Sequence, residues 1–476
     1  MTQEELSNIL LKHNALIEAP AGHGKTEMIV ELVRASEGKQ LLLTHTNAGV
    51  NALTTRLKKY GISSNQYFIS TIAGFCMRWC SAYPATAKFG DLLFGSDDYY
   101  QRCYTGAAEI FAHEWARNVI RRTYSGVIVD EYQDCIVEQH QIFLNLNQSV
   151  PVYVLGDPMQ AIFGWAGTLV SWENIEFEPV CVQTRPWRWK DTNPNLGEYL
   201  NIMRERLRPA LQGKQVTISV NNYQNSVFVV SPSQSINWKT RYVDGRFIKK
   251  LEKYHHVLYI SSDPKFQIEL CTRTAGKFQN DEPQECRELF NTAKDLDSND
   301  IQKISQALYR FLTICATGIK AKLGSYWKHI EAGDFNFQRI KKFPRFAELV
   351  MELKANPTID NILNILTWVR KNGSFPIYRR ELFYELERAL RYARDTSSSL
   401  MEAVQRIRSV LSLRKTYSFQ FLSSRTTLSK GLEFDCVIID LTQKYPLCVT
   451  DYYVALTRAT KAVYLITDKN TVIFKK

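Results

Sequence analysis

The sequence lacks any long hydrophobic run, and this absence bounds the class of protein before a motif is considered. No apolar stretch approaches the roughly 18 residues that cross a bilayer. The polar segment MTQEELSNIL at the start does not have the pattern of a secretory signal. Internal repeats and low-complexity tracts are also missing. We therefore expect ordinary globular domains in the cytoplasm, with no membrane partner.

Closely spaced cysteine pairs are scarce as well. The ten cysteines are scattered; Cys76 and Cys80 form a CxxxC pair, with no second close pair to complete a metal site. We predict buried free thiols in a reducing compartment. The alternative is an iron–sulfur site that uses Cys76, Cys80, Cys103 and one further cysteine.

Acidic residues are in deficit against basic ones. The 476 residues include 60 Lys and Arg but 48 Asp and Glu, which gives a net charge of +12. Such a surplus favours a polyanionic partner, because each phosphate contact releases counterions; a solvated basic surface is the alternative. Hydrophobic residues make up 45% of the chain, and the length suits about two to four domains with sizeable cores.

Short apolar strands alternate with helical patterns along the first part of the chain. Strand candidates lie at 16–17, 41–43, 127–129 and 152–155. This alternation predicts a parallel sheet with helices on both faces and ligands at the carboxyl ends of its strands. A second set of strand candidates lies at 227–230, 257–260, 437–439 and 463–466. A long, mostly helical stretch separates the middle two, so the sequence predicts an α/β fold with two lobes and a helical insertion.

A loop between the first strand candidate and the first helix has the pattern of a phosphate-binding loop. It reads APAGHGKT over residues 19–26, with alanine where the GxxxxGKT pattern has its first glycine. Backbone N–H groups at a helix N-terminus would cradle phosphates, Lys25 would neutralise them and Thr26 would hold Mg²⁺. The predicted nucleotide-binding residues are Gly22, His23, Gly24, Lys25 and Thr26. The alternative is a chance glycine turn.

Two more strand candidates end in polar segments that suit the same chemistry. In VIVDEYQD (127–134), Asp130 would bind Mg²⁺ through water and Glu131 would polarise the attacking water as general base. Capping of the next helix is the alternative for this pair. In VLGDPMQAIFGW (154–165), Gln160 could sense the γ-phosphate.

The loop after Gln160 carries two aromatic side chains beside Gly164. Phe163 and Trp165 lie where burial is difficult, and stacking on unpaired bases is a natural use of such side chains. The alternative is that they pack beneath the loop as core.

Together the segments AGxGKT, VDExQD and GDxxQxIFGW resemble the UvrD/Rep class of superfamily 1A DNA helicases. The resemblance implies two RecA-like lobes, ATP and Mg²⁺ as cofactors, and DNA-stimulated hydrolysis of ATP to ADP and phosphate. It also implies that single-stranded DNA, or a DNA end, lies across both lobes. Lys25, Glu131 and Gln160 would then be catalytic.

Later segments are similar to the remaining nucleotide motifs of that class, in the same order. PWRW resembles its Asn-Tyr-Arg motif, so Trp187 would stack on adenine and Arg188 would reach the γ-phosphate, with Arg185 as a rival for that role. TLSKGLEF closely matches motif V, which implies that Glu433 touches the ribose. VALTRA matches motif VI, which makes Arg458 the arginine finger from the second lobe.

The resemblance also implies contacts with DNA and with the adenine base. THTN looks like motif Ia, with His45 and Asn47 near DNA, and STIAGF is similar to the next DNA-contact segment, with Thr71 and Phe75. Gln3 lies about where the class has its adenine-reading glutamine.

The strand pattern and the resemblance together predict the domain boundaries. The first lobe is expected at 1–75 and 126–190, its short insertion at 76–125, the second lobe at 191–266 and 416–476, and the helical insertion at 267–415. Basic segments at 238–254 and 338–345 could track a phosphate backbone or be solvated faces. Aromatic side chains at 327–346 could form a protein interface or the core of the insertion.

Some features depart from the class. Glu27 and Ala166 stand where it has basic residues, and the first insertion is short, with about 50 residues between Phe75 and Val127. With 18 residues after Arg458, we expect no fused nuclease domain. This compact build is similar to the helicase-like subunit of Gabija anti-phage defence systems, which implies an ATPase–nuclease as protein partner. A stand-alone DNA repair helicase is the alternative.

Overall fold

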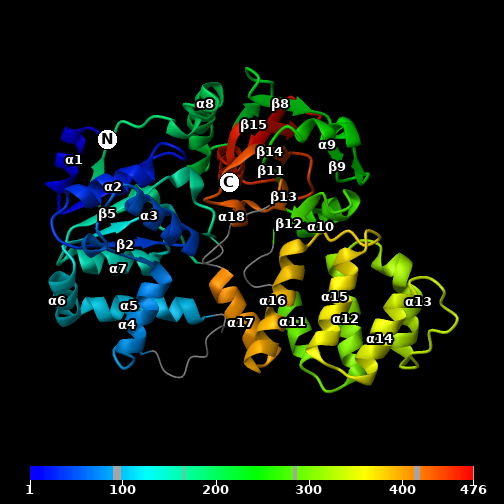
Figure 1. Cartoon of the computed structure of the whole chain (residues 1–476). Coiled ribbons are helices and arrows are strands. Elements are labelled where there is room, and N and C mark those ends of the chain that lie inside the picture. Colours follow the sequence, from blue (N-terminus) through cyan, green and yellow to red (C-terminus); the bar gives the residue numbers. More distant parts are fainter. Residues whose placement is uncertain (89–97, 165–166, 282–286, 412–418, 475–476) are drawn as a thin grey trace.

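The computed structural model describes residues 1–88, 98–164, 167–281, 287–411 and 419–474. Two six-stranded parallel sheets form the centres of two lobes that lie side by side, and a bundle of helices projects below the second lobe (Figure 1). The predicted α/β fold with two RecA-like lobes is confirmed. Within the described ranges, no helix has both the length and the apolar character that a membrane span requires.

The first lobe is built on a sheet with the strand order β3-β2-β4-β5-β1-β6. Strands β2, β4 and β5 are buried along their whole length, as expected for a parallel sheet covered on both faces. The strands are β1 (Asn14–Glu18), β2 (Gln40–Thr44), β3 (Tyr67–Thr71), β4 (Gly126–Val129), β5 (Val152–Gly156) and β6 (Pro179–Val180). The helices are α1 (Gln3–Leu10), α2 (Lys25–Ala35), α3 (Asn47–Lys59), α4 (Ile72–Ala82), α5 (Tyr99–Ala112), α6 (Glu114–Thr123) and α7 (Val137–Asn147).

The region expected as a short insertion belongs to the core of the first lobe. Helix α4 starts directly after β3 and runs across the expected boundary at residue 75. Cys80 of α4 and Phe111 of α5 lie in one buried cluster with Val127 and Val152 of the sheet. These helices therefore extend the first lobe and do not form a separate unit.

The second lobe is built on a sheet with the order β12-β13-β11-β14-β15-β8. Alternate residues of β14 face opposite sides: Val437 and Ile439 pack with α8 and α19, whereas Cys436 and Ile438 pack with α9 and α10. The strands are β8 (Val227–Val230), β11 (Val257–Ile260), β12 (Phe278–Asn280), β13 (Phe421–Ser424), β14 (Phe434–Asp440) and β15 (Ala459–Ile466). The helices are α8 (Pro194–Leu211), α9 (Gly245–Leu251), α10 (Pro264–Arg273), α18 (Thr426–Ser429) and α19 (Val449–Thr457). Two small antiparallel pairs join β7 (Val216–Ser219) to β16 (Thr471–Phe474) and β9 (Ile236–Asn237) to β10 (Tyr242–Val243).

The helical insertion begins later in the chain than the sequence indicated. Helix α10 packs on the second sheet and β12 is its edge strand, although both lie mostly beyond the expected boundary at residue 266. The three-residue strand β12, of sequence FQN, is too short to give a period-2 signal. The bundle itself consists of α11 (Arg287–Leu296), α12 (Ile301–Cys315), α13 (Ile319–Ala332), α14 (Pro344–Ala355), α15 (Ile359–Lys371), α16 (Arg380–Thr396) and α17 (Leu400–Leu411).

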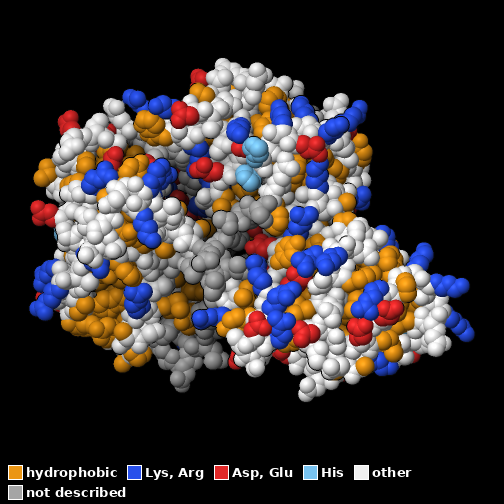
Figure 2. Space-filling view, in the orientation of Figure 1, with side chains coloured by type: hydrophobic (Ala, Val, Ile, Leu, Met, Phe, Trp, Pro, Cys, Tyr) orange, Lys and Arg blue, Asp and Glu red, His pale blue; other side chains and the backbone are white. Residues whose placement is uncertain are grey.

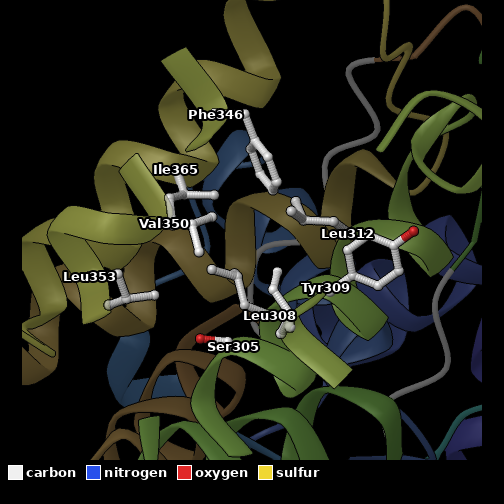
Figure 3. A pocket seen from close by; sticks show the side chains of 9 residues that line it. Ser305, Leu308, Tyr309, Leu312, Phe346, Val350, Leu353 and Ile365 are labelled. Carbon is white, nitrogen blue, oxygen red and sulfur yellow. The ribbon is translucent and has the colours of Figure 1, made fainter. Parts of the chain in front are cut away.

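The aromatic side chains at 327–346 form the core of the bundle. Phe335, Phe337 and Phe346 are buried, and Trp327 stacks on Tyr309 with ring centroids 4.3 Å apart. The interface alternative is therefore wrong for the buried three. Between α12, α14 and α15 a narrow cavity remains, lined almost wholly by aliphatic and aromatic side chains (Figure 3). None of the residues predicted for the nucleotide, metal or DNA sites lines this cavity.

Candidate active site between the two lobes

The loop between β1 and α2 has the backbone shape of a phosphate cradle. Gly22 and Gly24 have φ of 70° and 88°, in the left-handed region that favours glycine. A Cβ atom on Gly22 would lie 2.7 Å from the ring of Trp189. No side chain of the described chain caps α2 at Gly24, so its first N–H groups remain open to an anion. His23 is buried, with its Nδ1 2.9 Å from the carbonyl of Ala21, and contributes to the loop through its backbone.

Lys25 forms ion pairs with the two carboxylates at the end of β4. Its Nζ lies 2.9 Å from Glu131 and 4.0 Å from Asp130. Burial raises the pKa of Asp130 to about 6. Burial acts in the same direction on Glu131, but Lys25 and Lys430 overcome it and hold the pKa of Glu131 well below its usual range. The Glu131 backbone has a φ of 57°, which a residue with a side chain seldom adopts. The pair thus contains one firmly ionised carboxylate and one that accepts a proton more readily.

Asp157, directly after β5, forms hydrogen bonds with several segments that surround the site. Its carboxylate accepts hydrogen bonds from the N–H of Ala21 and the amide of Gln160, each at 3.0 Å. Arg204 of α8 donates to the other oxygen at 3.0 Å and is also paired with Glu18. Asp157 is fully buried, so these charge-assisted bonds connect the phosphate loop, the Gln160 segment and the second lobe. Asp157 lies within a predicted motif but was assigned no role. No pattern in the sequence indicated a role for Arg204.

Arg458 brings the second lobe into the site. Its Nη2 donates to Oε1 of Gln160 at 3.1 Å, and its Nε donates to the carbonyl of Val454 at 3.1 Å. The side chain is buried, and burial together with the nearby charge of Arg188 lowers its pKa to about 10. Arg458 therefore remains a cation at neutral pH, held beside Gln160 where an anionic group would stabilise it.

The segment before α8 places two further predicted residues at the cleft. Arg188 donates to the carbonyl of Thr457 at 2.7 Å and pairs with Glu433 at 2.9 Å. Glu433 is thus close to the site but is engaged by an arginine. Trp187 is 51% exposed, and a Cβ atom on Gly24 would lie 3.2 Å from its ring. About half of its surface is therefore exposed next to the phosphate loop, with Nζ of Lys190 5.1 Å from its ring centroid. Arg185 is exposed, and only Arg188 of the two rivals contacts the second lobe in the described chain.

Lys430 was part of a motif but was assigned no role, and the structure brings it into the site. It forms an ion pair with Asp134 and donates to the backbone carbonyl of Gln160 at 2.7 Å. Its Nζ also lies 5.1 Å from the ring centroid of Phe163 and 3.8 Å from Glu131. A buried cation from the second lobe thus joins three segments of the first. No local sequence pattern could have predicted this contact, because Lys430 and Asp134 are 296 positions apart in the chain.

Residues 2–165 match the family described as an AAA domain. That AAA domain contains the phosphate loop, the Asp130–Glu131 pair and Gln160. The Gabija protein GajB of Bacillus cereus (strain VD045) is 28% identical over 193 residues, covering 32% of this chain and 38% of GajB. The match to an AAA domain and the likeness to GajB agree with a nucleotide-binding site in the first lobe.

Two solved helicase structures are also similar, each with a TM-score of 0.35 and 10% identity. The complex of Arterivirus nonstructural protein 10 (helicase) with DNA aligns over 98% of this chain and 63% of that one. The PRRSV helicase aligns over 97% of this chain and 54% of that one. The chain therefore spans less than two thirds of GajB and of both helicases.

The residues predicted to meet DNA are distributed along the carboxyl edge of the sheet of the first lobe. Half-buried His45 follows β2, with its Nε2 3.4 Å from Sγ of Cys135, and burial lowers its pKa. Asn47 is the first residue of α3. Thr71 caps α4 by accepting from the N–H of Gly74 at 3.0 Å.

The aromatic members of that set differ in exposure. Phe75 is buried and stacks on Phe111 with ring centroids 5.7 Å apart, so a contact with DNA would require it to leave the core. Phe163 is half-buried beside Lys430. Trp165 lies outside the described residues. Gln3 is exposed in the first turn of α1.

The oxygen donors at the site suit a hard cation. Thr26, in the first turn of α2, and Asp130 could offer two oxygen ligands, and Mg²⁺ ordinarily takes one or two protein oxygens together with phosphates and water. In the described ranges, no cluster of three or more His, Cys, Asp or Glu side chains could hold a metal alone. Cys76, Cys80 and Cys103 are free, buried thiols, and Sγ of Cys80 donates to the carbonyl of Cys103 at 3.3 Å.

Proposed function

We propose that this chain is a DNA-stimulated ATPase of helicase type that senses or translocates along single-stranded DNA. ATP and Mg²⁺ would bind between the lobes, and DNA would cross the carboxyl edges of both sheets. The observation that supports this best is the hydrogen bond from Arg458 of the second lobe to Gln160 of the first. A site assembled from two lobes couples their relative motion to the chemistry performed between them.

The residues divide the chemical work among them. Bound ATP with Mg²⁺ supplies the reacting phosphoryl group, with Thr26 and Asp130 as the metal's protein ligands. Lys25 would exchange its ion pair with Glu131 for phosphate oxygens. Glu131, freed from that pair and still ionised, would accept the proton of the attacking water. Arg188 and Arg458 would stabilise the charge that develops on the phosphoryl oxygens.

Trp187, Glu433 and Gln3 would complete the nucleotide site. Trp187 would stack on adenine with its exposed indole, Glu433 would bind the ribose once Arg188 turns to phosphate, and Gln3 would contact the adenine edge. His45, Asn47, Thr71, Phe163 and Trp165 would line the DNA path.

The ATPase proposal is tested with an Arg458→Gln variant. This change keeps a hydrogen-bonding side chain but removes the charge, so we expect at least about a hundredfold loss of DNA-stimulated turnover, roughly 2.7 kcal/mol of barrier. Nucleotide affinity should change less. Arg206→Gln, which removes an exposed charge from α8, is the matched control. Full DNA-stimulated turnover by a folded Arg458→Gln variant would contradict the proposal.

We further propose that the chain acts in anti-phage defence with an ATPase–nuclease partner in the cytoplasm. The likeness to GajB supports this reading over a stand-alone DNA repair helicase. The test is co-expression with a neighbouring ATPase–nuclease gene followed by phage challenge, with Lys25→Ala as the inactive form. Protection that needs both genes and Lys25 supports defence. Duplex unwinding by the isolated chain, with no protection, supports the repair helicase.

A further inference from the structure

A row of four lysines on the second lobe lies apart from the ATP site and has no role in it. The basic row consists of Lys239, Lys249, Lys250 and Lys253, all exposed. Lys249 and Lys250 lie on α9, Lys253 in the turn after it and Lys239 between β9 and β10, where Lys and Arg side chains gather in the upper right of Figure 2. Helix α9 packs on the face of the second sheet opposite to α8 and α19. The row therefore faces away from the side of the sheet that holds Arg458.

The basic row carries uncompensated charge. Other basic residues nearby are paired: Arg241 with Glu269, and Lys277 with Glu252. The four lysines have no ion pair with any described residue. Asp244 does not neutralise the row either, since it is buried and caps α9 while also pairing with Arg246.

The segment that carries the row, from Trp238 to His255, contacts the protein near both ends of strand β14. At one end, Nε1 of Trp238 donates to the carbonyl of Thr442, just past the end of the strand. At the other end, the N–H of His255 donates to Asp435 at 2.9 Å. The seven residues of β14 span roughly 20 Å. The segment with the four lysines therefore extends across the face of the sheet and is not confined to one point.

Aromatic rings under the lysine side chains restrict where the ammonium groups lie. Lys250 Nζ is 5.8 Å from the ring centroid of Phe228 and 5.7 Å from that of Tyr464. Lys253 lies 5.0 Å from Tyr254, and Lys239 lies 5.9 Å from Trp238. Cation–π contacts of this kind hold the side chains over the sheet while the charges remain exposed.

We propose that the basic row binds the phosphate backbone of a nucleic acid, at a second site outside the ATP cleft. A span of roughly 20 Å passes about twelve phosphate charges of duplex DNA, and lysines without base-reading partners contact backbone without sequence preference. An acidic protein surface is the less suitable partner, because lysine is depleted at protein interfaces. The inference rests on the proposed function, since it extends the DNA path beyond the cleft.

The test compares two DNA probes: a single-stranded oligonucleotide, and a duplex that carries the same strand as a tail. The variant is Lys249→Glu with Lys250→Glu and Lys253→Glu in the full chain. We expect its affinity for the tailed duplex to fall at least tenfold and the slope of log affinity against log salt to fall by about 3. Affinity for the single strand should change less than threefold, and ATPase activity without DNA should be unchanged.

A matched control removes the same charge from the helical insertion. Lys320, Lys328 and Lys371 are exposed lysines of that bundle. Their triple Glu variant has the same net charge as the test variant and should bind the tailed duplex within about threefold of the parent. If the two triple variants have equal affinity and equal salt slope, the basic row does not bind DNA. Its lysines would then face a protein partner or only water. If the parent shows no DNA-stimulated ATPase at all, the proposed function fails, which is a different outcome.

Discussion

At the scale of single residues, the nucleotide site is held together by groups that ATP would have to separate. Lys25 is paired with Glu131 at 2.9 Å, so the cation meant for phosphate is engaged by the predicted general base. Charge from a nucleotide would release both groups at once, because Lys25 prefers the more highly charged partner. Nucleotide binding would in this way also activate Glu131.

The first prediction follows from that pair. Lys25→Ala should lower ATP hydrolysis at least about a hundredfold, or roughly 2.7 kcal/mol of barrier, while the protein still folds. Lys25 belongs to none of the hydrophobic clusters of the first lobe, so the substitution leaves the packing of the apolar core intact. Phosphate release measures the activity, and circular dichroism with thermal melting checks the fold. Hydrolysis at the parental rate would refute the phosphate-loop assignment.

The second prediction uses the pKa of Asp130, which burial raises to about 6. The folded protein binds this proton more tightly than the unfolded chain, so Asp130 costs stability as pH rises from about 4 to about 6, and the cost persists above that. Asp130→Asn should therefore stabilise the nucleotide-free protein at pH 8, by on the order of 1 kcal/mol, while abolishing Mg²⁺-dependent hydrolysis.

Urea denaturation at pH 8 and pH 5 checks this sign, because the gain should shrink at the lower pH. A variant that is equally destabilised at both values would contradict it. A carboxylate kept at a stability cost is expected where metal binding requires it.

At the scale of elements, the phosphate loop is shaped by a tryptophan from the other end of the lobe. Trp189 is buried against Gly22 and donates from Nε1 to the carbonyl of Ala459 at 2.7 Å. The loop, the segment before α8 and the start of β15 therefore share one packing unit.

The third prediction tests that unit. Gly22→Ala should destabilise the fold by more than about 2 kcal/mol, because it adds a clash with the Trp189 ring to the roughly 1–2 kcal/mol of a left-handed backbone. Nucleotide binding should weaken with it. Gly61→Ala is the matched control, since Gly61 has a φ of 69° but open space around it. Chemical denaturation of both variants compares them, and equal destabilisation would remove the packing argument.

The loop after β5 is the second element with a defined prediction. Phe163→Ala with Trp165→Ala should weaken single-strand binding more than tenfold at fixed salt, because stacking contributes roughly 1–3 kcal/mol per base. Phe163 is half-buried beside Lys430, so thermal melting must show that the variant is folded. A folded double variant with parental affinity would mean that these rings are packing residues.

At the scale of the whole molecule, the two lobes meet through apolar and polar contacts. Ala21, Met159 and Trp189 of the first lobe lie in the buried apolar cluster of the second lobe. Arg458 with Gln160, Lys430 with Asp134 and Arg204 with Asp157 all cross from one lobe to the other. The charged contacts are exchangeable for contacts with ATP and water, whereas the apolar part of the interface favours one arrangement of the lobes.

The last prediction concerns the isolated chain. We expect a protein that hydrolyses ATP but separates DNA strands weakly or not at all, and that acts in a complex with a nuclease. Helices α4 to α6 pack into the core of the first lobe, so they leave little separate structure to grip a duplex ahead of the motor. Mass measurement, ATPase and strand-separation assays on the purified chain check this. A monomer that unwinds long duplexes processively would favour the repair-helicase alternative.

The sequence by itself determined the features that depend on neighbouring residues. The phosphate loop, the carboxylates after β4 and Gln160 each lie within one strand-to-turn segment, where apolar strand and polar end adjoin in the chain. Because parallel strands place their carboxyl ends at one edge, these segments had to converge once the sheet was recognised.

Only the tertiary structure decided the contacts between distant segments. Packing between distant parts of the chain decided four features: the role of Lys430, the ion pair of Asp157 with Arg204, the burial of Phe75 and the edge position of β12. No pattern of neighbouring residues indicates them. A buried Phe and a DNA-stacking Phe have the same sequence signal, since both are aromatic. Which one Phe75 is depends on Phe111, which lies across the lobe on another helix.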